Sequence, residues 1–181
     1  MAGKKPQKKE KYDKRNNLND LTGREWLLLT KSIWISEKCA DDKFAFQHPA
    51  PFLINDIGRL IRFFTKKNMV VLDPFCGSGT TLVAAARENR KGIGIDLNRK
   101  YCQISRKRLQ ELRLKKNQQI ICGDSLKKIS EIRGRIDYCV TSPPYHNILR
   151  HNGGGLREIK DKDVRNGARI GVEYYSDDKR D

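Results

Sequence analysis

Residues 69–96 read MVVLDPFCGSGTTLVAAARENRKGIGID, and this stretch decides the fold. The apolar run Met69–Asp73 predicts a short buried strand, and a glycine-rich loop follows it directly. Residues 80–89 are strong helix formers, and Gly92–Asp96 predicts a second strand. Strand, tight loop, helix and strand in this order indicate a parallel βαβ unit.

The alternation continues on both sides of this unit. Downstream, the pattern predicts a long basic helix at 98–116, a strand at 119–124, a short helix at 125–132 and a strand at 136–142. Upstream, apolar residues at helical spacing predict a helix at 51–64. The fold class is therefore α/β, a Rossmann-like, doubly wound and mainly parallel sheet that is incomplete in this chain.

The flanking segments set the domain organisation. Residues 1–17 are lysine-rich and nearly free of apolar side chains, so we expect a flexible basic arm. The core is expected at 18–145, and TGREWLLLTKSIWI at 22–35 is apolar enough to predict one short packed element. Residues 146–181 are polar and glycine-rich, and they predict loops that lead to a missing C-terminal half.

Composition narrows the function classes. The formal net charge is +16 in 181 residues, which indicates a polyanionic partner. No apolar run approaches the roughly 20 residues of a membrane-spanning helix, and the N-terminus lacks an apolar signal core. The five cysteines are scattered without a close pair, so we expect reduced, mostly buried thiols, no metal site and a cytoplasmic protein.

The glycine-rich loop predicts a nucleotide-like ligand. Gly77 and Gly79 allow a tight turn and a close backbone approach, and the helix from Thr80 directs free N–H groups at the same place. Asp96 ends the second strand, where it can accept hydrogen bonds from ribose hydroxyls, and Asp124 ends the third, within reach of an adenine amino group. The alternative is that both aspartates are ordinary strand-end caps.

The string DPFCGSGTT at 73–81 resembles the first motif of the DNA amino-methyltransferases, written DPFxGSGTT. A phosphate-binding P-loop would need GK[ST] after its second glycine, where GTT stands. The resemblance implies S-adenosylmethionine as cofactor, and it implies that HPAPF at 48–52 folds over its methionine end. The implied cofactor-binding residues are His48, Asp73, Phe75, Gly77, Gly79, Thr80, Thr81, Asp96, Asp124 and Ser125.

TSPPY at 141–145 supplies the candidate catalytic residues. An exocyclic amine is a poor nucleophile because its lone pair is delocalised into the base, and two acceptors can localise that lone pair. Ser142 Oγ and the Pro143 carbonyl can each accept one N–H, and Pro143 and Pro144 stiffen the chain. Tyr145 can stack on a target base flipped out of double-stranded DNA.

The serine at position 142 sets the expected base specificity. In the family that TSPPY resembles, serine is usual for methylation of cytosine N4, whereas aspartate or asparagine is commoner for adenine N6. We therefore expect a site-specific, cytosine-N4 DNA methyltransferase of the restriction-modification type. Three alternatives stay open: an N6-adenine DNA methyltransferase, a tRNA guanosine-N2 methyltransferase, and a non-catalytic nucleic-acid-binding fragment.

DNA contacts are expected after the catalytic motif, with Arg150, Arg157 and Arg165 as candidates. The basic residues of the 98–116 helix favour a solvated outer face instead; they are Arg99, Lys100, Arg106, Lys107, Arg108, Lys115 and Lys116. Because relatives continue with further strands, three explanations stay open: a truncated piece, a cleaved product, and a split enzyme whose sheet a second polypeptide or copy completes. We also expect this chain alone to be poorly active.

Overall fold

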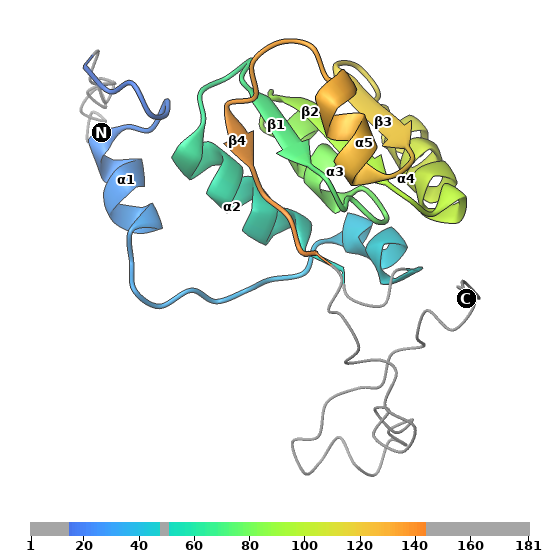
Figure 1. Ribbon diagram of the computed structural model, residues 1–181. Coiled ribbons are helices and arrows are strands. Elements are labelled where there is room, and N and C mark those ends of the chain that lie inside the picture. The colour runs from blue at the N-terminus through green and yellow to red at the C-terminus, as the bar shows by residue number, and fades with distance from the viewer. Residues whose placement is uncertain (1–14, 48–50, 144–181) are drawn as a thin grey trace, which may run out of the picture.

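The computed structural model describes residues 15–47 and 51–143, and in these ranges it shows a four-stranded parallel sheet (Figure 1). The strands are β1 (Val70–Asp73), β2 (Lys91–Asp96), β3 (Gln118–Cys122) and β4 (Tyr138–Cys139), in the order β3-β2-β1-β4. β2 pairs in parallel with β1 and with β3, and β4 pairs in parallel with β1, so all four strands point the same way. This order is the first half of a doubly wound sheet, and the predicted α/β Rossmann-like class is confirmed.

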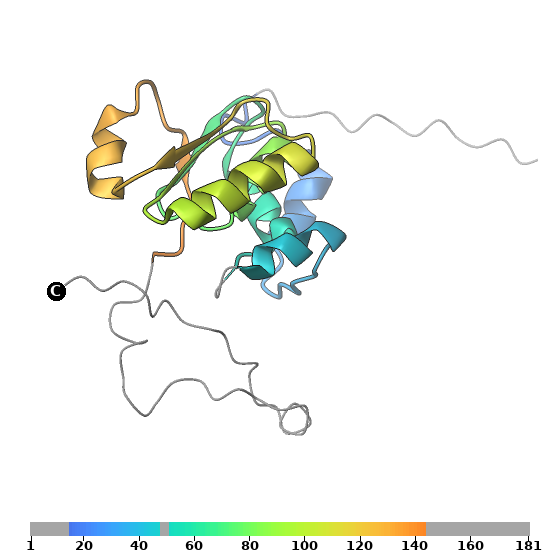
Figure 2. The ribbon, with the colours of Figure 1, turned by 90° about the vertical axis from the view of Figure 1, so that its right-hand side faces the viewer.

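The helices that precede β1, β2 and β3 share one face of the sheet. α2 (Ile54–Phe64) contacts α3 (Thr80–Arg87), and α3 contacts α4 (Arg99–Glu111). Figure 2 shows α4 beneath the sheet, whereas α5 (Ser125–Lys128) and the short 3-10 turn η2 (Ile129–Glu131) lie beside β3. A core of buried aliphatic side chains fills the space between helices and strands; it includes Ile57, Ile61, Val71, Leu82, Val83 and Leu109.

Helix α4 is shorter than predicted, because it ends at Glu111 rather than at 116. Arg113 has φ +56°, and its N–H donates to the Gln110 carbonyl. The Leu114 N–H donates back to the Leu109 carbonyl over 2.8 Å, which closes a Schellman motif. Leu112 and Leu114 pack on the core, so apolar burial turns the chain out of the helix at this point.

The segment before the sheet differs from the prediction. A capping box between Thr22 and Glu25 starts α1 (Gly23–Leu29), so an element forms where one was expected. α1 packs against α2, with the Trp26 and Phe63 ring centroids 4.8 Å apart, but none of its residues is buried and Leu27 is 71% exposed. The 3-10 element η1 (Ala40–Gln47) was not predicted.

Two further expectations need correction. β4 comprises only Tyr138 and Cys139 of the strand predicted at 136–142. All five cysteines are free, but only Cys76 and Cys102 are buried, so the expectation of mostly buried thiols was wrong. Within the ranges that the structure describes, every helix is too short or too polar to cross a membrane.

Candidate active site

The carboxyl ends of the strands bring the candidate site residues into one row. Along the sheet order, Asp124 follows β3, Asp96 ends β2, Asp73 ends β1, and Ser142 follows β4. Three strand spacings of about 4.8 Å separate the first and last strands, so the row spans roughly 14 Å. The chain reverses its winding between β1 and β4, and such switch points are where sheets of this kind bind ligands.

The glycine-rich loop turns tightly between β1 and α3. The Gly79 N–H donates to the Cys76 carbonyl over 2.8 Å, and Gly79 itself has φ +80° as the N-cap of α3. A Cβ at this position would lie 2.7 Å from Ser105 Oγ, so α4 leaves no room for a side chain. Glycine is therefore required here for both its conformation and its size.

Asp96 ties the loop to the end of β2. Its Oδ2 accepts the Gly77 N–H over 2.8 Å, and its Oδ1 accepts the Asn98 N–H over the same distance. The side chain is half-buried, and a carboxylate offers about four acceptor positions. Asp96 can therefore accept further hydrogen bonds from a ligand while it holds the loop.

Asp124 and Ser125 lie at the start of α5. Asp124 caps this helix, because its Oδ1 accepts the Leu126 N–H over 3.0 Å. The capping role that was the alternative for Asp124 is thus present, at the start of a helix. The half-buried carboxylate still has acceptor positions for a further hydrogen bond. Ser125 is buried and donates its hydroxyl to the Pro74 carbonyl, so it joins the end of β3 to the start of the loop.

Asp73 is turned into the protein. It is 1% exposed, and its Oδ2 accepts the Thr81 hydroxyl over 2.5 Å. Its Oδ1 accepts the Phe75 N–H over 3.1 Å and the Thr141 hydroxyl over 2.7 Å. Burial raises the pKa of the Asp73 carboxyl, and these three hydrogen bonds act in the opposite direction.

The remaining loop residues differ in exposure. Thr80 and Thr81 are buried, and the Thr80 Oγ1 accepts a hydrogen bond from Arg108 over 2.9 Å. Phe75 is 41% exposed beside the loop, which leaves its ring free for apolar contact with a ligand. Asp73 and both threonines therefore support the loop, whereas Phe75 and Asp96 can reach a molecule on its outer side.

Helix α4 holds the loop from behind, which the sequence interpretation missed. Ser105 Oγ donates to the Gly77 carbonyl over 2.7 Å, and Arg108 Nη1 donates to the Ser78 carbonyl over 3.3 Å. Arg108 Nη2 also donates to the Asp41 carbonyl of η1 over 3.1 Å. Arg108 is 1% exposed, so its assignment to a solvated outer face was wrong. The spacing Tyr101, Ser105, Arg108 repeats every three to four residues and marks the inward face.

The catalytic motif is described only in part. Thr141 and Ser142 are half-buried, and Pro143 is exposed. The Val140 N–H donates to the Leu72 carbonyl over 3.1 Å, so the chain enters the motif alongside β1. Pro144 and Tyr145 lie outside the described residues, as do His48 and the three candidate DNA-contacting residues Arg150, Arg157 and Arg165. In the described ranges no cluster of three or more His, Cys, Asp or Glu could hold a metal ion.

The strand order and the glycine-rich loop define a Rossmann-like chain with a candidate ligand site at the carboxyl edge of its sheet. The chain belongs to the DNA methylase family, whose model matches residues 2–107, more than half of its length. A second model, described as conserved hypothetical protein 95, matches residues 59–178.

Curated relatives agree with this family. Type II methyltransferase M2.DpnII of Streptococcus pneumoniae is 39% identical over 100 residues, which cover 55% of this chain and 35% of the relative. Type II methyltransferase M.BglI of Bacillus subtilis is 38% identical over 104 residues, or 56% of this chain and 28% of the relative. The chain thus matches about a third of the length of these relatives.

Solved structures give weaker likenesses. A Thermus thermophilus protein in complex with S-adenosyl-L-methionine is 31% identical with a TM-score of 0.44, covering 57% of this chain and 39% of that one. TrmN from Thermus thermophilus is 24% identical with a TM-score of 0.48, covering 58% of this chain and 32% of that one. Both scores lie below 0.5, so the fold class is taken from the strand order and register.

Proposed function

We propose that this chain carries the S-adenosylmethionine site and the catalytic motif of a DNA methyltransferase that modifies the exocyclic amine of cytosine, N4. The observation that carries the proposal is the row of Asp124, Asp96, the glycine-rich loop and Ser142 along one sheet edge. Membership of the DNA methylase family supports it, as do the type II methyltransferase relatives.

The residues present fit the proposed cofactor. Asp96 has acceptor capacity for two ribose hydroxyls, and Asp124 is placed one strand further out, where it can accept from an adenine amino group. The glycine-rich loop has no side chain at Gly77 or Gly79, so a ligand can approach its backbone. When bound, S-adenosylmethionine supplies an electrophilic methyl group on a positively charged sulfur.

Ser142 and Pro143 act on the target amine. The Ser142 hydroxyl oxygen and the Pro143 carbonyl each accept one N–H, which directs the nitrogen lone pair away from the ring and toward the methyl carbon. With the cofactor bound, the amine nitrogen would gain the methyl group, S-adenosylhomocysteine would leave, and one amine proton would pass to solvent. The remaining rate enhancement comes from holding the amine in line with the methyl group, because the reaction needs no covalent bond to the protein.

The proposed DNA target follows from charge and family. The net charge of +16 favours association with phosphate backbones, and a base must leave the duplex to reach Ser142. We infer that Tyr145 stacks on that base and that Arg150, Arg157 and Arg165 contact DNA. A second polypeptide or copy that pairs with the β4 edge would complete the sheet, since β4 is an edge strand among the described residues.

The reaction is tested with mixed-sequence DNA and methyl-labelled S-adenosylmethionine, followed by digestion to nucleosides and mass spectrometry. We expect labelled N4-methylcytosine. Labelled N6-methyladenine would keep the mechanism and overturn the base assignment at Ser142. Absence of label from DNA, when saturable cofactor binding is present, would overturn transfer by this chain alone.

A further inference from the structure

Asp73 joins the loop and helix that follow it directly to a segment 68 residues further along the chain. Its donors are the Phe75 N–H in the glycine-rich loop, the Thr81 hydroxyl in the first turn of α3, and the Thr141 hydroxyl beside Ser142. Thr141 lies two residues beyond the end of β4, past the ladder that pairs β4 with β1. A side-chain bond of 2.7 Å therefore continues the attachment of the catalytic segment where the strand stops.

Asp73 is 1% exposed, and its carboxylate oxygens accept hydrogen bonds from the protein's own groups. An ionised carboxylate has only acceptors, so it can take all three hydrogen bonds at once. A neutral acid would place an O–H where one donor now stands, and one of the three bonds would be lost or reversed. The observed arrangement of three donors is therefore the one that suits the charged form.

We propose that Asp73 is a positioning residue that couples the glycine-rich loop to residues 141–143, so that occupancy of the loop fixes the place of Ser142. The proposal rests on the proposed function, because it assigns the loop to the cofactor and Ser142 to the target amine. In this proposal Asp73 acts on the cofactor site indirectly, through its hydrogen bonds to the loop, and not by the direct contact that the family resemblance implies. Thr81 links Asp73 to the loop and α3, and Thr141 links Asp73 to the catalytic segment.

The coupling is tested at the Thr141 hydroxyl. Thr141→Val removes the donor and keeps the shape, whereas Thr141→Ser keeps the donor. Amide exchange measured by NMR at the Val140 N–H, which donates to Leu72, reports how firmly the segment is held. We expect Thr141→Val to speed this exchange about fivefold and Thr141→Ser to leave it near wild type. Equal rates in all three proteins would overturn the proposal.

The Gly92 N–H, which donates to the Asn117 carbonyl over 3.0 Å at the other end of the sheet, serves as an internal reference. A general loss of stability would speed exchange at Gly92 as well as at Val140, whereas loss of the Asp73 bond should speed Val140 alone. Thr81→Val is the second variant, because it removes the donor on the loop side. We expect it too to speed exchange at Val140, and no change there would contradict coupling through Asp73.

S-adenosylhomocysteine separates this proposal from the proposed function. In wild type and Thr141→Ser we expect the ligand to slow exchange at Val140 further, whereas Thr141→Val should bind it with affinity within about twofold and show no added protection. Added protection in Thr141→Val equal to that in wild type would overturn the coupling. If wild type binds no ligand, the proposed function fails, and the ligand-free exchange rates of Thr81→Val and Thr141→Val still decide whether Asp73 links the two segments.

Discussion

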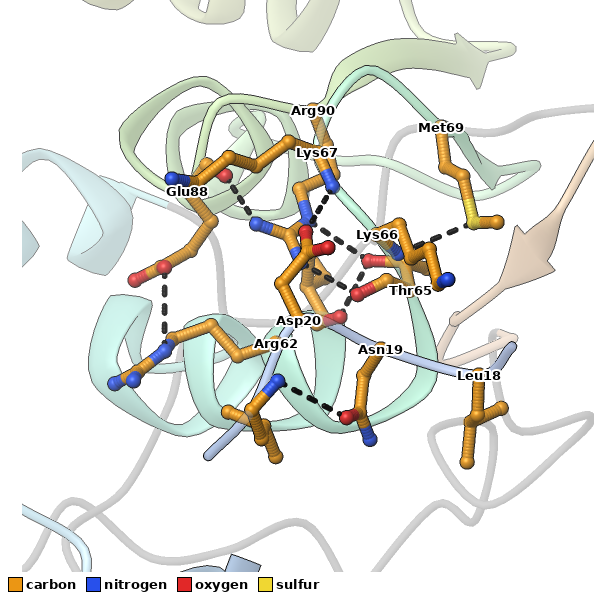
Figure 3. A network of polar contacts seen from close by, with 12 residues as sticks. Leu18, Asn19, Asp20, Arg62, Thr65, Lys66, Lys67, Met69, Glu88 and Arg90 are labelled. Atoms are coloured by element: carbon orange, nitrogen blue, oxygen red, sulfur yellow. Dashed lines mark hydrogen bonds and ion pairs between the residues drawn. The ribbon is translucent and has the colours of Figure 1, made fainter. Parts of the chain in front are cut away.

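The two ends of the sheet use buried polar groups in different ways. At the amino-terminal ends of the strands, Arg90 is 5% exposed and donates to the Thr65 hydroxyl, the Thr65 carbonyl and the Glu88 carbonyl, beside Asp20 at 3.8 Å (Figure 3). Arg62 pairs nearby with Glu25 at 2.8 Å and with Glu88 at 3.6 Å. At the carboxyl-terminal ends, carboxylates and α4 side chains hold a glycine-rich loop instead.

The amino-terminal cluster also borders a pocket of about 270 Å³, lined by Asp20, Leu21, Glu25, Arg62, Lys67, Glu88, Asn89 and Arg90. The ion pairs of Asp20, Glu25 and Glu88 with Arg62 and Arg90 lie within this lining. The carboxyl-terminal edge, by contrast, keeps two half-buried carboxylates with spare acceptor positions, at Asp96 and Asp124. The first cluster joins the residues before α1 to the core, whereas the second holds the loop that we propose binds the cofactor.

The largest effect expected is on stability, from the two buried arginines. Arg90→Met and Arg108→Met each leave buried oxygens without donors, so each should lower the free energy of unfolding by about 3 kcal/mol in urea titrations. Only Arg108→Met should also weaken S-adenosylhomocysteine binding, by at least about tenfold, because only Arg108 holds the Ser78 carbonyl and Thr80. Equal affinities in the two variants would show that the two ends of the sheet do not differ in their effect on ligand binding.

Ligand affinity should depend on a carboxylate at one end and not at the other. Asp96→Ala removes acceptors for the Gly77 N–H and for the proposed ribose, so S-adenosylhomocysteine affinity should fall about 100-fold in isothermal titration calorimetry. Asp20→Ala, which removes an acceptor of the Lys67 N–H, is the matched control and should stay within about twofold of wild type. A comparable loss in both variants would point to a general effect of instability.

Two glycines with positive φ give a matched test of packing. Gly79 and Gly134 have φ +80° and +96°, but a Cβ added at Gly79 would lie 2.7 Å from its nearest neighbour, whereas one added at Gly134 would meet no atom within 4 Å. Gly134→Ala should therefore cost about 1 kcal/mol of stability from backbone strain alone, and Gly79→Ala about 2 kcal/mol or more. Thermal unfolding of both variants measures the difference, and equal costs would mean that α4 does not press on the loop.

The smallest effect expected is an opposite pH dependence of two carboxyls. Hydrogen bonds from Thr22 lower the pKa of Glu25, so its contribution to stability is present above its ordinary value of 4.5 and is lost as pH falls through the folded value. Burial raises the pKa of Asp73 despite its three donors, so between 3.8 and the folded value the folded state keeps a proton that the unfolded chain has lost, and stability falls as pH rises through that window. Above the folded value the carboxylate is ionised and accepts all three hydrogen bonds.

Unfolding free energies between about pH 3 and 6 check both signs. The excess stability of wild type over Glu25→Gln should grow as pH rises, and its excess over Asp73→Asn should shrink. The same sign for both variants would contradict the assignment of Asp73 as a carboxyl whose ionised form is disfavoured by burial.

Much of the carboxyl-terminal edge could be predicted from the sequence. The apolar runs that end in Asp73 and Asp96, with glycines between them, indicate strands and a ligand loop, because both periodicity and turn chemistry are local. The end of α4 was predicted five residues too late, because the Schellman motif forms around Arg113, a residue with no intrinsic preference for positive φ.

The supports of the loop were harder to predict. A basic helix is typical of a solvated face, and the burial of Arg108 depends on carbonyls of Ser78 and Asp41 that only the fold brings together. Asp73 and Thr141 are 68 positions apart in the sequence, and their contact likewise depends on the pairing of β1 with β4. The amino-terminal cluster around Arg90 was missed for the same reason, since its partners at Asp20 and Thr65 are distant in the sequence.

The most direct test of the account is a titration of the ¹⁵N-labelled chain with S-adenosylhomocysteine, followed by NMR of the backbone amides. We expect saturable shifts at Phe75–Gly79, at Asp96 and at Asp124–Ser125, with the amides of Thr65 and Arg90 unchanged. Shifts centred on Arg90, or no saturable shift at the carboxyl-terminal edge, would contradict the assignment of that edge as the cofactor site.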